Sequence, residues 1–453
     1  MEKMKIDKAE VLTGAGLLRK KNKKETLDRV EYMINNMKSN KAFQSDLRIS
    51  KNQSSYKALE EYTNKYKKYR QDWKKQPKEC IRDKTLGSDM QAKGIPPLCL
   101  DIETAAICDL ACPFCFREYF ATPDKLINDD FCYELIDQAA DLKVPSIKFN
   151  WRGEPLLHPK LPDFISYAKD KGILETIINT NATKLDEKKS NQLIDAGLDF
   201  MIYSFDGGSK ETYEKMRPGR FKENTFEHVY DNIKNFNKIR NSRKSKFPYT
   251  KIQMILTEDT FKEKKSFFNL FSDCVDDVSV SQYTERGGQL TDVDKKTREA
   301  YQAALSKHDL PQGTPYMRDP KGNLFLSKFR KPCEQPFQRL LVTYEGRVGM
   351  CCYDWGATHP VGYLKSEAFS NESEYDKIVT KAKKGAKGFE LLENVEKSKI
   401  FNKPLEKVQT LSEIWYGKEI NHVREKHVNS KIDDIEICKG CAFKDTYEWI
   451  AAN

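Results

Sequence analysis

From residue 98 to residue 282, short apolar runs alternate with longer stretches in which apolar positions recur every three or four residues. The first pattern is typical of buried strands and the second of amphipathic helices. The alternation predicts strands at residues 98–104, 146–151, 174–179, 199–207, 250–257 and 277–282. Six strands with helices between them predict an α/β fold with a parallel sheet, arranged as a partial (β/α)6 TIM-like barrel. In such a fold, reactive side chains follow the carboxyl ends of the strands.

Residues 1–96 have a different pattern, in which helical stretches are separated by polar breaks. Residues 23–39 have apolar side chains at helical spacing, and residues 56–75 carry a stripe of large side chains at Tyr56, Leu59, Tyr62, Tyr66, Tyr69 and Trp73. Such a stripe is more typical of packing than of ligand binding. We therefore expect a basic helical extension at 1–96, the barrel at 97–290, a polar linker at 291–330, and a cysteine-bearing tail at 331–453.

The chain has 453 residues, enough for two or three domains, and 38% of them are hydrophobic, enough for a globular core. It has no apolar run of the ~18 residues that a membrane span needs. Its charged start lacks the pattern of a signal peptide, so we expect a cytoplasmic protein. Twelve cysteines in that compartment indicate metal or redox chemistry rather than disulfides.

The net charge of +10 is concentrated in residues 1–96, which hold 24 Lys and Arg against 13 Asp and Glu, a net of +11. The rest of the chain has a net charge of −1. A basic segment can attract nucleic acid, anionic lipid or a phosphorylated partner. A lysine-rich helical surface in contact with water is the simpler interpretation, so nucleic acid is not the partner we favour.

Three cysteines, Cys108, Cys112 and Cys115, follow the first expected strand. A structural zinc site needs four ligands, and the sequence offers no fourth nearby. A redox pair needs only Cys112 and Cys115 and leaves Cys108 unexplained. Three thiolates instead fit three corners of a four-iron, four-sulfur cluster and leave one iron open for a substrate or cofactor.

The CxxxCxxC spacing, with the aromatic Phe114 before the last cysteine, resembles the signature of the radical S-adenosylmethionine (SAM) superfamily. Three later segments resemble that family in the same order: "WRGEPLLHP", "NTNAT" and "YSFDGGSKETYEKMRPG". In the first of them, Arg152 stands where the family usually has a glycine. The resemblance implies that SAM contacts Phe114, Gly153, Glu154, Thr180, Asn181, Ser204 and Arg217. Gly153 and Glu154 would hold the amino group of its methionine moiety, and Arg217 would pair with its carboxylate.

The resemblance also implies the chemistry. The open iron would chelate SAM, and one-electron reduction would cleave SAM to methionine and a 5′-deoxyadenosyl radical. That radical removes a hydrogen atom from a substrate C–H bond, while the protein supplies placement and exclusion of water. A reductant such as flavodoxin or ferredoxin would be the partner. We therefore expect a radical SAM oxidoreductase of the dehydrogenase or epimerase type.

Five more cysteines lie in the tail, at Cys333, Cys351, Cys352, Cys438 and Cys441. Their spacing fits a zinc ribbon or an iron–sulfur cluster equally well. After a barrel of this family, the layout resembles the SPASM/Twitch extension in its Gly346, its "LSEIW" helix and its closing CxxC. The resemblance implies one auxiliary 4Fe-4S cluster, two clusters in all, held by Cys333, Cys351, Cys438 and Cys441. Cys352 is the alternative to Cys351, and a lysine-rich insert spans residues 365–407.

The substrate is the least determined feature. Single-cluster members of the family include enzymes that oxidise or epimerise alcohol carbons. We therefore favour a sugar, aminocyclitol or nucleotide-sugar of surface-polysaccharide or secondary metabolism. A peptide is the alternative, but residues 1–96 lack the alternating strands of a leader-binding module. A tRNA substrate is less favoured than either. A non-enzymatic iron–sulfur or zinc protein is also less favoured, because Gly153, Glu154, Ser204 and Arg217 indicate an intact cofactor site.

Two reactions fit an alcohol carbon. A tail cluster held by four thiolates has no open iron and can accept an electron, which favours a two-electron oxidation. Epimerisation instead requires a hydrogen-atom donor, and Cys274, next to the sixth expected strand, is the nearest candidate in sequence. Cys80, Cys99 and Cys132 have no partner at metal spacing and are expected to be buried as small apolar side chains.

Overall fold

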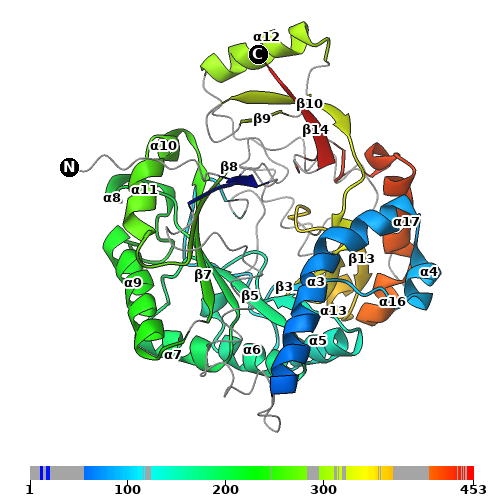
Figure 1. Ribbon diagram of the computed structural model, residues 1–453, viewed down its shortest axis with the longest axis horizontal. Coiled ribbons are helices and arrows are strands. Elements are labelled where there is room, and N and C mark those ends of the chain that lie inside the picture. Colours follow the sequence, from blue (N-terminus) through cyan, green and yellow to red (C-terminus); the bar gives the residue numbers. More distant parts are fainter. Residues whose placement is uncertain are drawn as a thin grey trace.

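The structure, a computed structural model, describes residues 11–13, 17–20, 56–115, 117, 124–245, 247–282, 295–310, 314, 316–318, 323–355, 357, 359–370, 408–435, 437–439, 441, 443 and 446–452. Its main feature is a curved sheet of eleven strands (Figure 1). Six consecutive strands in this sheet are parallel: β3 (Cys99–Ile102), β4 (Ser146–Lys148), β5 (Glu175–Thr180), β6 (Phe200–Ser204), β7 (Tyr249–Leu256) and β8 (Asp277–Gln282). They correspond to the six expected strands, and the predicted α/β fold with a mostly parallel sheet is confirmed.

Helices connect these strands and cover the outer face of the sheet: α5 (Asp129–Asp141), α6 (Leu161–Asp170), α7 (Glu187–Asp195), α8 (Lys210–Met216), α9 (Phe226–Ser242), α10 (Glu258–Phe261) and α11 (Lys264–Phe271). Several begin at a residue whose side chain accepts a backbone N–H one turn on, as Asn128 does from Phe131 and Asp186 from Lys189. Alternate strand residues such as Ile147, Ile178 and Met201 are fully buried in the core between sheet and helices.

The other face of the strands packs at one end against α3 (Tyr56–Arg82). Tyr66 and Tyr69 of this helix form a second apolar cluster with the first residues of β6 and β7, Phe200 and Tyr249. Their hydroxyls donate to the buried carboxylate of Glu175, at 2.9 and 3.0 Å. Because Glu175 is the first residue of β5, α3 covers the amino ends of the parallel strands, opposite the end where reactive loops lie.

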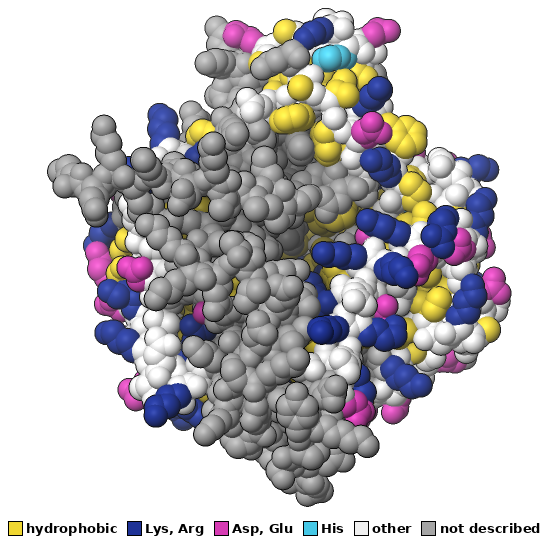
Figure 2. All heavy atoms as spheres, in the orientation of Figure 1, with side chains coloured by type: hydrophobic (Ala, Val, Ile, Leu, Met, Phe, Trp, Pro, Cys, Tyr) yellow, Lys and Arg dark blue, Asp and Glu magenta, His cyan; other side chains and the backbone are white. Residues whose placement is uncertain are grey.

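The opposite side of α3 exposes the lysines that make this segment basic, Lys65, Lys67, Lys68, Lys74, Lys75 and Lys78. Lys and Arg side chains gather on this side of the molecule (Figure 2). The aromatic stripe of α3 thus packs against the strands, and the charged side of the helix contacts water. Among the helices described, none is both long and apolar enough to cross a membrane.

The cysteine-bearing tail continues the main sheet. β11 (Arg339–Val342) runs parallel to β3, and β12 (Arg347–Gly349) and β13 (Pro360–Tyr363) follow it antiparallel. The β11–β12 turn contains Gly346, whose φ of +98° favours glycine. The Nη1 of Arg339 lies 3.0 Å from the Oδ2 of Asp101 across the β11–β3 pair. This pairing covers the edge that β3 would otherwise leave open.

Two further segments differ from the sequence-based expectation. The range 291–330, expected to be a linker, contains α12 (Lys295–Lys307), β9 (Tyr316–Arg318) and β10 (Leu324–Arg330). β10 pairs with β9 and with the last strand, β14 (Tyr447–Ala451), in a second sheet that forms the lobe at the top of Figure 1. At the other end of the chain, β1 (Val11–Thr13) and β2 (Leu17–Lys20) extend the main sheet beside β8, where helices alone were expected.

The remaining helices described in the tail are α13 (Glu367–Ser370), α16 (Leu411–Trp415) and α17 (Lys418–Val428), and α4 (Gly87–Ala92) lies near them. α16 coincides with the expected "LSEIW" helix. The helix expected at 23–39, and residues 371–407 of the insert, lie outside the described residues.

Candidate functional site

The loop after β3 holds Cys108, Cys112 and Cys115 at the carboxyl edge of the parallel strands. Its backbone is tied to the segment after α8, because Ala111 N–H donates to the carbonyl of Pro218 at 2.9 Å. Arg220 N–H likewise donates to the carbonyl of Asp109 at 2.8 Å. Cys112 is buried, whereas Cys108 and Cys115 are half-buried.

Burial controls the protonation of these thiols. It raises the pKa of Cys108 well above its ordinary value, with the carboxylate of Glu154 acting in the same direction. It raises the pKa of Cys112 to about 12, against the opposing effect of the Arg217 guanidinium. Both thiols therefore keep their protons at neutral pH until a cation displaces them, as expected of ligands that release protons on metal binding.

The loop after β4 packs directly on the cysteine loop through Gly153. Gly153 has a φ of +66°, and a Cβ atom there would lie 2.2 Å from the carbonyl oxygen of Ala105 and 2.5 Å from that of Ile107. The next residue, Glu154, donates its N–H to the same Ile107 carbonyl at 2.9 Å. A glycine is thus required both by the backbone conformation and by the lack of space.

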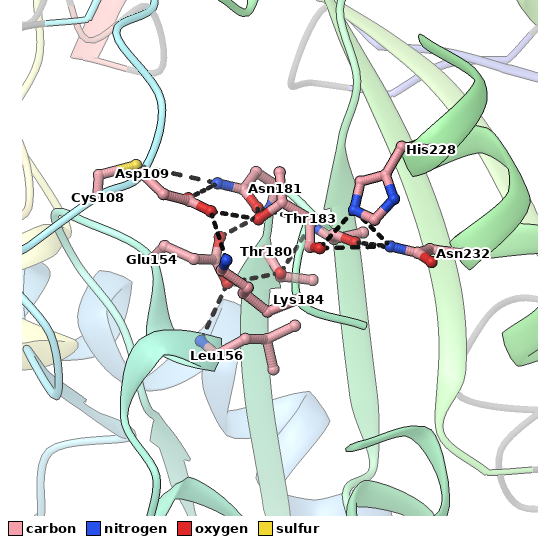
Figure 3. Close-up of polar contacts among 11 residues, drawn as sticks. Cys108, Asp109, Glu154, Leu156, Thr180, Asn181, Thr183, Lys184, His228 and Asn232 are labelled. Atoms are coloured by element: carbon pink, nitrogen blue, oxygen red, sulfur yellow. Dashed lines mark hydrogen bonds and ion pairs between the residues drawn. The ribbon is translucent and has the colours of Figure 1, made fainter. Parts of the chain in front are cut away.

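Glu154 connects the β4 loop to the end of β5 (Figure 3). Its Oε1 accepts from Leu156 N at 3.0 Å and from Thr180 Oγ1 at 2.7 Å, and its Oε2 accepts from Asn181 N at 2.7 Å. Burial, and then the charge of Asp109, raise the pKa of Glu154 to about 7. A cation placed beside this carboxylate would favour its ionised form.

Asp109, inside the cysteine loop, is a residue that the sequence analysis missed. Its Oδ1 accepts from Asn181 Nδ2 at 2.9 Å and its Oδ2 from Thr183 Oγ1 at 2.6 Å. The same Asn181 amide lies 3.9 Å from the sulfur of Cys108. The sequence feature that could have identified Asp109 is its position between two cysteines of the motif. Asp109 fixes the β5 loop relative to the first cysteine.

Arg217 binds a carboxylate of the protein itself. Its Nε and Nη2 donate to Oδ2 of Asp206 at 2.8 and 2.5 Å. Asp206, also missed from the sequence, is fully buried, and its Oδ1 accepts from Ile255 N at 2.6 Å. The guanidinium lies over the ring of Phe114, 5.7 Å from its centroid. Arg217 is therefore next to the cysteine loop, but two of its donor atoms bind a carboxylate of the protein itself.

Part of the inner face of the strands is less buried than the core. In β4 to β8, eight residues that alternate with buried core positions are only half-buried: Lys148, Ile177, Asn179, Ile202, Ser204, Gln253, Ile255 and Ser281. Two of them, Ile177 and Ile202, also pack against the cluster formed with α3. We call these eight residues the lumen set. Asn179 Oδ1 is a buried acceptor without a hydrogen-bond partner among the described residues. Such an atom marks a place where a ligand can donate.

Cys274 is not brought to this site. It lies just before β8, at the amino ends of the parallel strands, whereas the cysteine loop lies at their carboxyl ends. Its thiol is buried, and its sulfur lies 3.7 Å from the carbonyl oxygen of Phe271. Proximity to a strand in sequence did not indicate which end of the strand the thiol would occupy.

The tail cysteines Cys333, Cys351, Cys352, Cys438 and Cys441 form one neighbourhood. Burial raises the pKa of Cys333, and the nearby Cys441, Cys438 and Cys352 act in the same direction. The pKa of Cys351 is raised by its contact with Cys352, by burial, and by Cys333 and Cys441. Burial raises the pKa of Cys438 to about 12. Within the part of the chain that is described, no three His, Cys, Asp or Glu side chains are grouped as ligands of a single ion. The tail cysteines are thus brought together, but not as a preformed ligand sphere.

The second sheet holds the closing CxxC in place. Arg330 of β10 donates through Nη2 to the carbonyl of Cys438 and through Nη1 to Asp433, the latter at 2.9 Å. The hydroxyl of Tyr447, in β14, donates to the carbonyl of Cys441 at 2.7 Å. β10, which lies within the expected linker range, and β14 therefore both anchor the CxxC backbone.

A direct contact joins the Gly153 loop to the tail cysteine region. Trp151 Nε1 donates to the carbonyl of Cys352 at 3.2 Å, and the rings of Trp151 and Trp355 lie 5.8 Å apart. Arg152 donates Nε and Nη2 to the buried carboxylate of Glu103 at 2.6 and 2.8 Å and Nη1 to the carbonyl of Trp355 at 3.3 Å. The arginine that departs from the family pattern thus connects the Gly153 loop to the tail.

Comparison with known proteins identifies the barrel. Residues 102–263 match the family model of the Radical SAM superfamily. Over 124 residues the chain is 32% identical to GTP 3′,8-cyclase of Chlorobaculum tepidum, covering 27% of this chain and 37% of that protein. Over 123 residues it is 31% identical to PqqA peptide cyclase of Granulibacter bethesdensis, covering 27% and 32%. The matched segments thus span about a third of the length of these curated relatives.

Among solved structures, BtrN in complex with AdoMet and 2-DOIA is similar with a TM-score of 0.39 and 14% identity, covering 78% of this chain and 98% of that one. The segment matched by the family model contains the cysteine loop, the Gly153–Glu154 loop and the strands that position both. The similarity to the Radical SAM superfamily therefore extends over residues 102–263 of this chain.

Proposed function

We propose that this chain is a radical SAM enzyme that oxidises an alcohol carbon of a hydroxyl-rich small molecule, such as a sugar, aminocyclitol or nucleotide-sugar. The observation that carries the substrate class is the lumen set. Five of its eight side chains are polar, Lys148, Asn179, Ser204, Gln253 and Ser281, and three are isoleucines. Amides and hydroxyls mixed with a few apolar groups suit a ring that presents hydroxyls at its edge and C–H bonds on its faces.

The residues at the carboxyl edge fit the cofactors of the family. Cys108, Cys112 and Cys115 supply three thiols beside a loop that only glycine can form at Gly153. Asn179 offers a buried acceptor without a partner among the described residues. When bound, a four-iron cluster and SAM supply the one-electron reduction and the carbon radical that removes a hydrogen atom from the substrate.

The roles of the protein residues follow from their contacts. The backbone of Glu154 contacts the cysteine loop, and its carboxylate accepts two backbone N–H groups. We assign this carboxylate to the amino group of SAM. Thr180 and Asn181 fix that carboxylate. Arg217 has its Nη1 left for the carboxylate of SAM, since Nε and Nη2 bind Asp206. Phe114, whose ring lies next to the Arg217 guanidinium, and Ser204 complete the proposed contacts.

We assign the tail cysteines Cys333, Cys351, Cys438 and Cys441 to an auxiliary 4Fe-4S cluster, with Cys352 as the alternative to Cys351. Ligation by four thiolates would leave no open iron, which suits electron transfer better than substrate binding. This property favours oxidation over epimerisation. The burial of Cys274 at the opposite edge of the sheet further reduces the support for epimerisation by that thiol. A reductant such as flavodoxin or ferredoxin and a cytoplasmic location complete the proposal.

The first experiment is metal analysis after anaerobic reconstitution. We expect about eight irons per chain, and about four in the variant C108A/C112A/C115A. Cys132→Ala, which removes a buried thiol of the main core, is the matched control and should keep all of them. One zinc and no tail iron would contradict the auxiliary cluster, while loss of all iron in the triple variant would contradict two separate sites.

The second experiment tests the reaction. With dithionite and SAM, the protein should release 5′-deoxyadenosine, and candidate sugars, cyclitols and peptides should be screened for acceleration. Oxidation lowers the product mass by two hydrogens. Epimerisation in deuterated water leaves the composition unchanged except that one deuterium replaces one hydrogen. Gln253→Ala should weaken apparent substrate binding more than it changes release of 5′-deoxyadenosine without substrate. Acceleration by a peptide alone would favour the runner-up function, a peptide-modifying enzyme.

A further inference from the structure

His427 lies between two arms of the tail cysteine region. It is the last but one residue of α17 and is 1% exposed. Its Nδ1 accepts the backbone N–H of Cys333 at 3.0 Å, and its Nε2 lies 3.8 Å from the sulfur of Cys438. One ring therefore contacts the first cysteine of the tail through the backbone and the fourth through the side chain.

The hydrogen bonds fix the tautomer of this ring. A backbone N–H can only donate, so Nδ1 of His427 must be the nitrogen that carries a lone pair. In a neutral imidazole the other nitrogen then carries the proton. Nε2–H is therefore directed at the sulfur of Cys438, and the contact is an N–H···S hydrogen bond with nitrogen as the donor.

The position of the ring is held by its own helix. Arg424, one turn earlier in α17, is fully buried and donates through Nε to the carbonyl of Pro336 at 2.9 Å. Pro336 belongs to the short helical turn Gln335–Phe337 that follows Cys333. The guanidinium also lies 4.1 Å from the ring centroid of Trp415. Helix α17 thus contacts the Cys333 segment through two residues, Arg424 and His427. Of these two, His427 also contacts a second cysteine, Cys438.

We propose that His427 is a positioning residue of the tail site, which sets the distance between Cys333 and Cys438 and donates an N–H···S hydrogen bond to the Cys438 thiolate when a metal centre is bound. The inference rests on the proposed function in treating these cysteines as ligands. Hydrogen bonds to ligating sulfur withdraw electron density from it and raise the reduction potential of an iron–sulfur cluster. His427 would therefore make the tail cluster a better electron acceptor.

The test uses the full chain with C108A/C112A/C115A, so that the tail holds the only expected cluster. In this background the tail cluster is titrated by electron paramagnetic resonance with His427 and with three variants. H427F retains an aromatic ring but has no donor or acceptor. H427Q retains an N–H donor near the position of Nε2, and H427N retains an acceptor near the position of Nδ1. We expect H427F and H427N to shift the midpoint to lower potential, and H427Q to restore most of the shift.

Equal midpoints in the parent and H427F, with tail iron retained in both, would overturn the proposal. If H427F loses tail iron, retention of iron in H427Q or H427N supports positioning, and loss in both of these variants as well overturns it.

The outcome is separable from that of the proposed function. If the parent binds zinc and no iron, the auxiliary cluster is wrong, and the zinc protein labelled with ¹⁵N-histidine tests His427 directly. The ¹⁵N resonances that disappear in H427Q belong to His427. They should then show a protonated Nε2 and an unprotonated Nδ1, and Cys438→Ala should shift them. The reverse tautomer, or no shift, would overturn the inference about His427.

Discussion

Arg217 and Asp206 form a buried ion pair beside the cysteine loop, in which Nε and Nη2 of the guanidinium donate to one carboxylate oxygen at 2.8 and 2.5 Å. The pair joins the segment after α8 to the end of β6, and through Asp206 Oδ1 to β7. Arg217 therefore has two functions to separate, support of the loop and the proposed contact with SAM.

The first prediction concerns this pair. Arg217→Ala leaves Asp206 buried without its cation, and we expect a loss of about 3–5 kcal/mol in the free energy of unfolding. The control is Arg220→Ala, which breaks a half-exposed pair with Asp124 and should cost no more than ~1 kcal/mol. Urea denaturation of the metal-free proteins measures both. Equal stability of the two variants would show that the pair contributes little.

The second prediction concerns the contact between loops at Gly153. Gly153→Ala should displace the cysteine loop and abolish both SAM binding and iron at the first cluster, because its Cβ would lie 2.2 Å from the Ala105 carbonyl oxygen. Gly94→Ala is a matched control, since Gly94 has a φ of +61° and no atom within 4 Å of the position that a Cβ would take. The control should lose only about 1–2 kcal/mol to the backbone conformation and keep its iron. Iron content and SAM binding by calorimetry decide between these outcomes.

The third prediction is a pH dependence due to Glu154. Its pKa in the folded protein is about 7, above the ordinary 4.5, so the folded state binds the proton more tightly than the unfolded state. Stability from this group is full below pH 4.5 and is lost as the pH rises to 7, by on the order of 3 kcal/mol. Glu154→Gln removes the titration. The difference in unfolding free energy between wild type and E154Q should change between pH 4.5 and 7 and stay constant above. Parallel profiles over that range would contradict it.

The fourth prediction concerns the covering of the strand ends by α3. The double variant Tyr66→Phe and Tyr69→Phe keeps the rings but removes two hydrogen bonds to the buried carboxylate of Glu175. Each bond to a charged group contributes about 1.5–3 kcal/mol, so we expect a clear fall in the thermal midpoint. Lys68→Ala, which breaks an exposed pair with Asp72 on the same helix, should change it little. A midpoint unchanged in the double variant would mean that α3 is not fastened through Glu175.

Features that depend on local pattern could be predicted from the sequence alone. Short apolar runs indicated the six parallel strands, and apolar positions at helical spacing indicated the helices between them. Burial of an element selects apolar residues at the positions that face the core, so its spacing is visible in the sequence. The cysteine spacing and the three later segments located the candidate site at the carboxyl edge, because parallel strands bring their following loops to one edge.

Contacts between distant segments are defined only in the folded chain. The pairing of β11 with β3, the contact of Trp151 with Cys352 and the partner of Arg217 each link residues whose separation carries no sequence period. Cys274 and Asp206 illustrate the reason. Cys274 lies just before an expected strand and Asp206 lies within one. Yet Cys274 faces the helix-covered core at the amino ends of the strands, whereas Asp206 binds an arginine at the site. Which face and which edge a side chain occupies depends on long-range packing, and no local pattern encodes it.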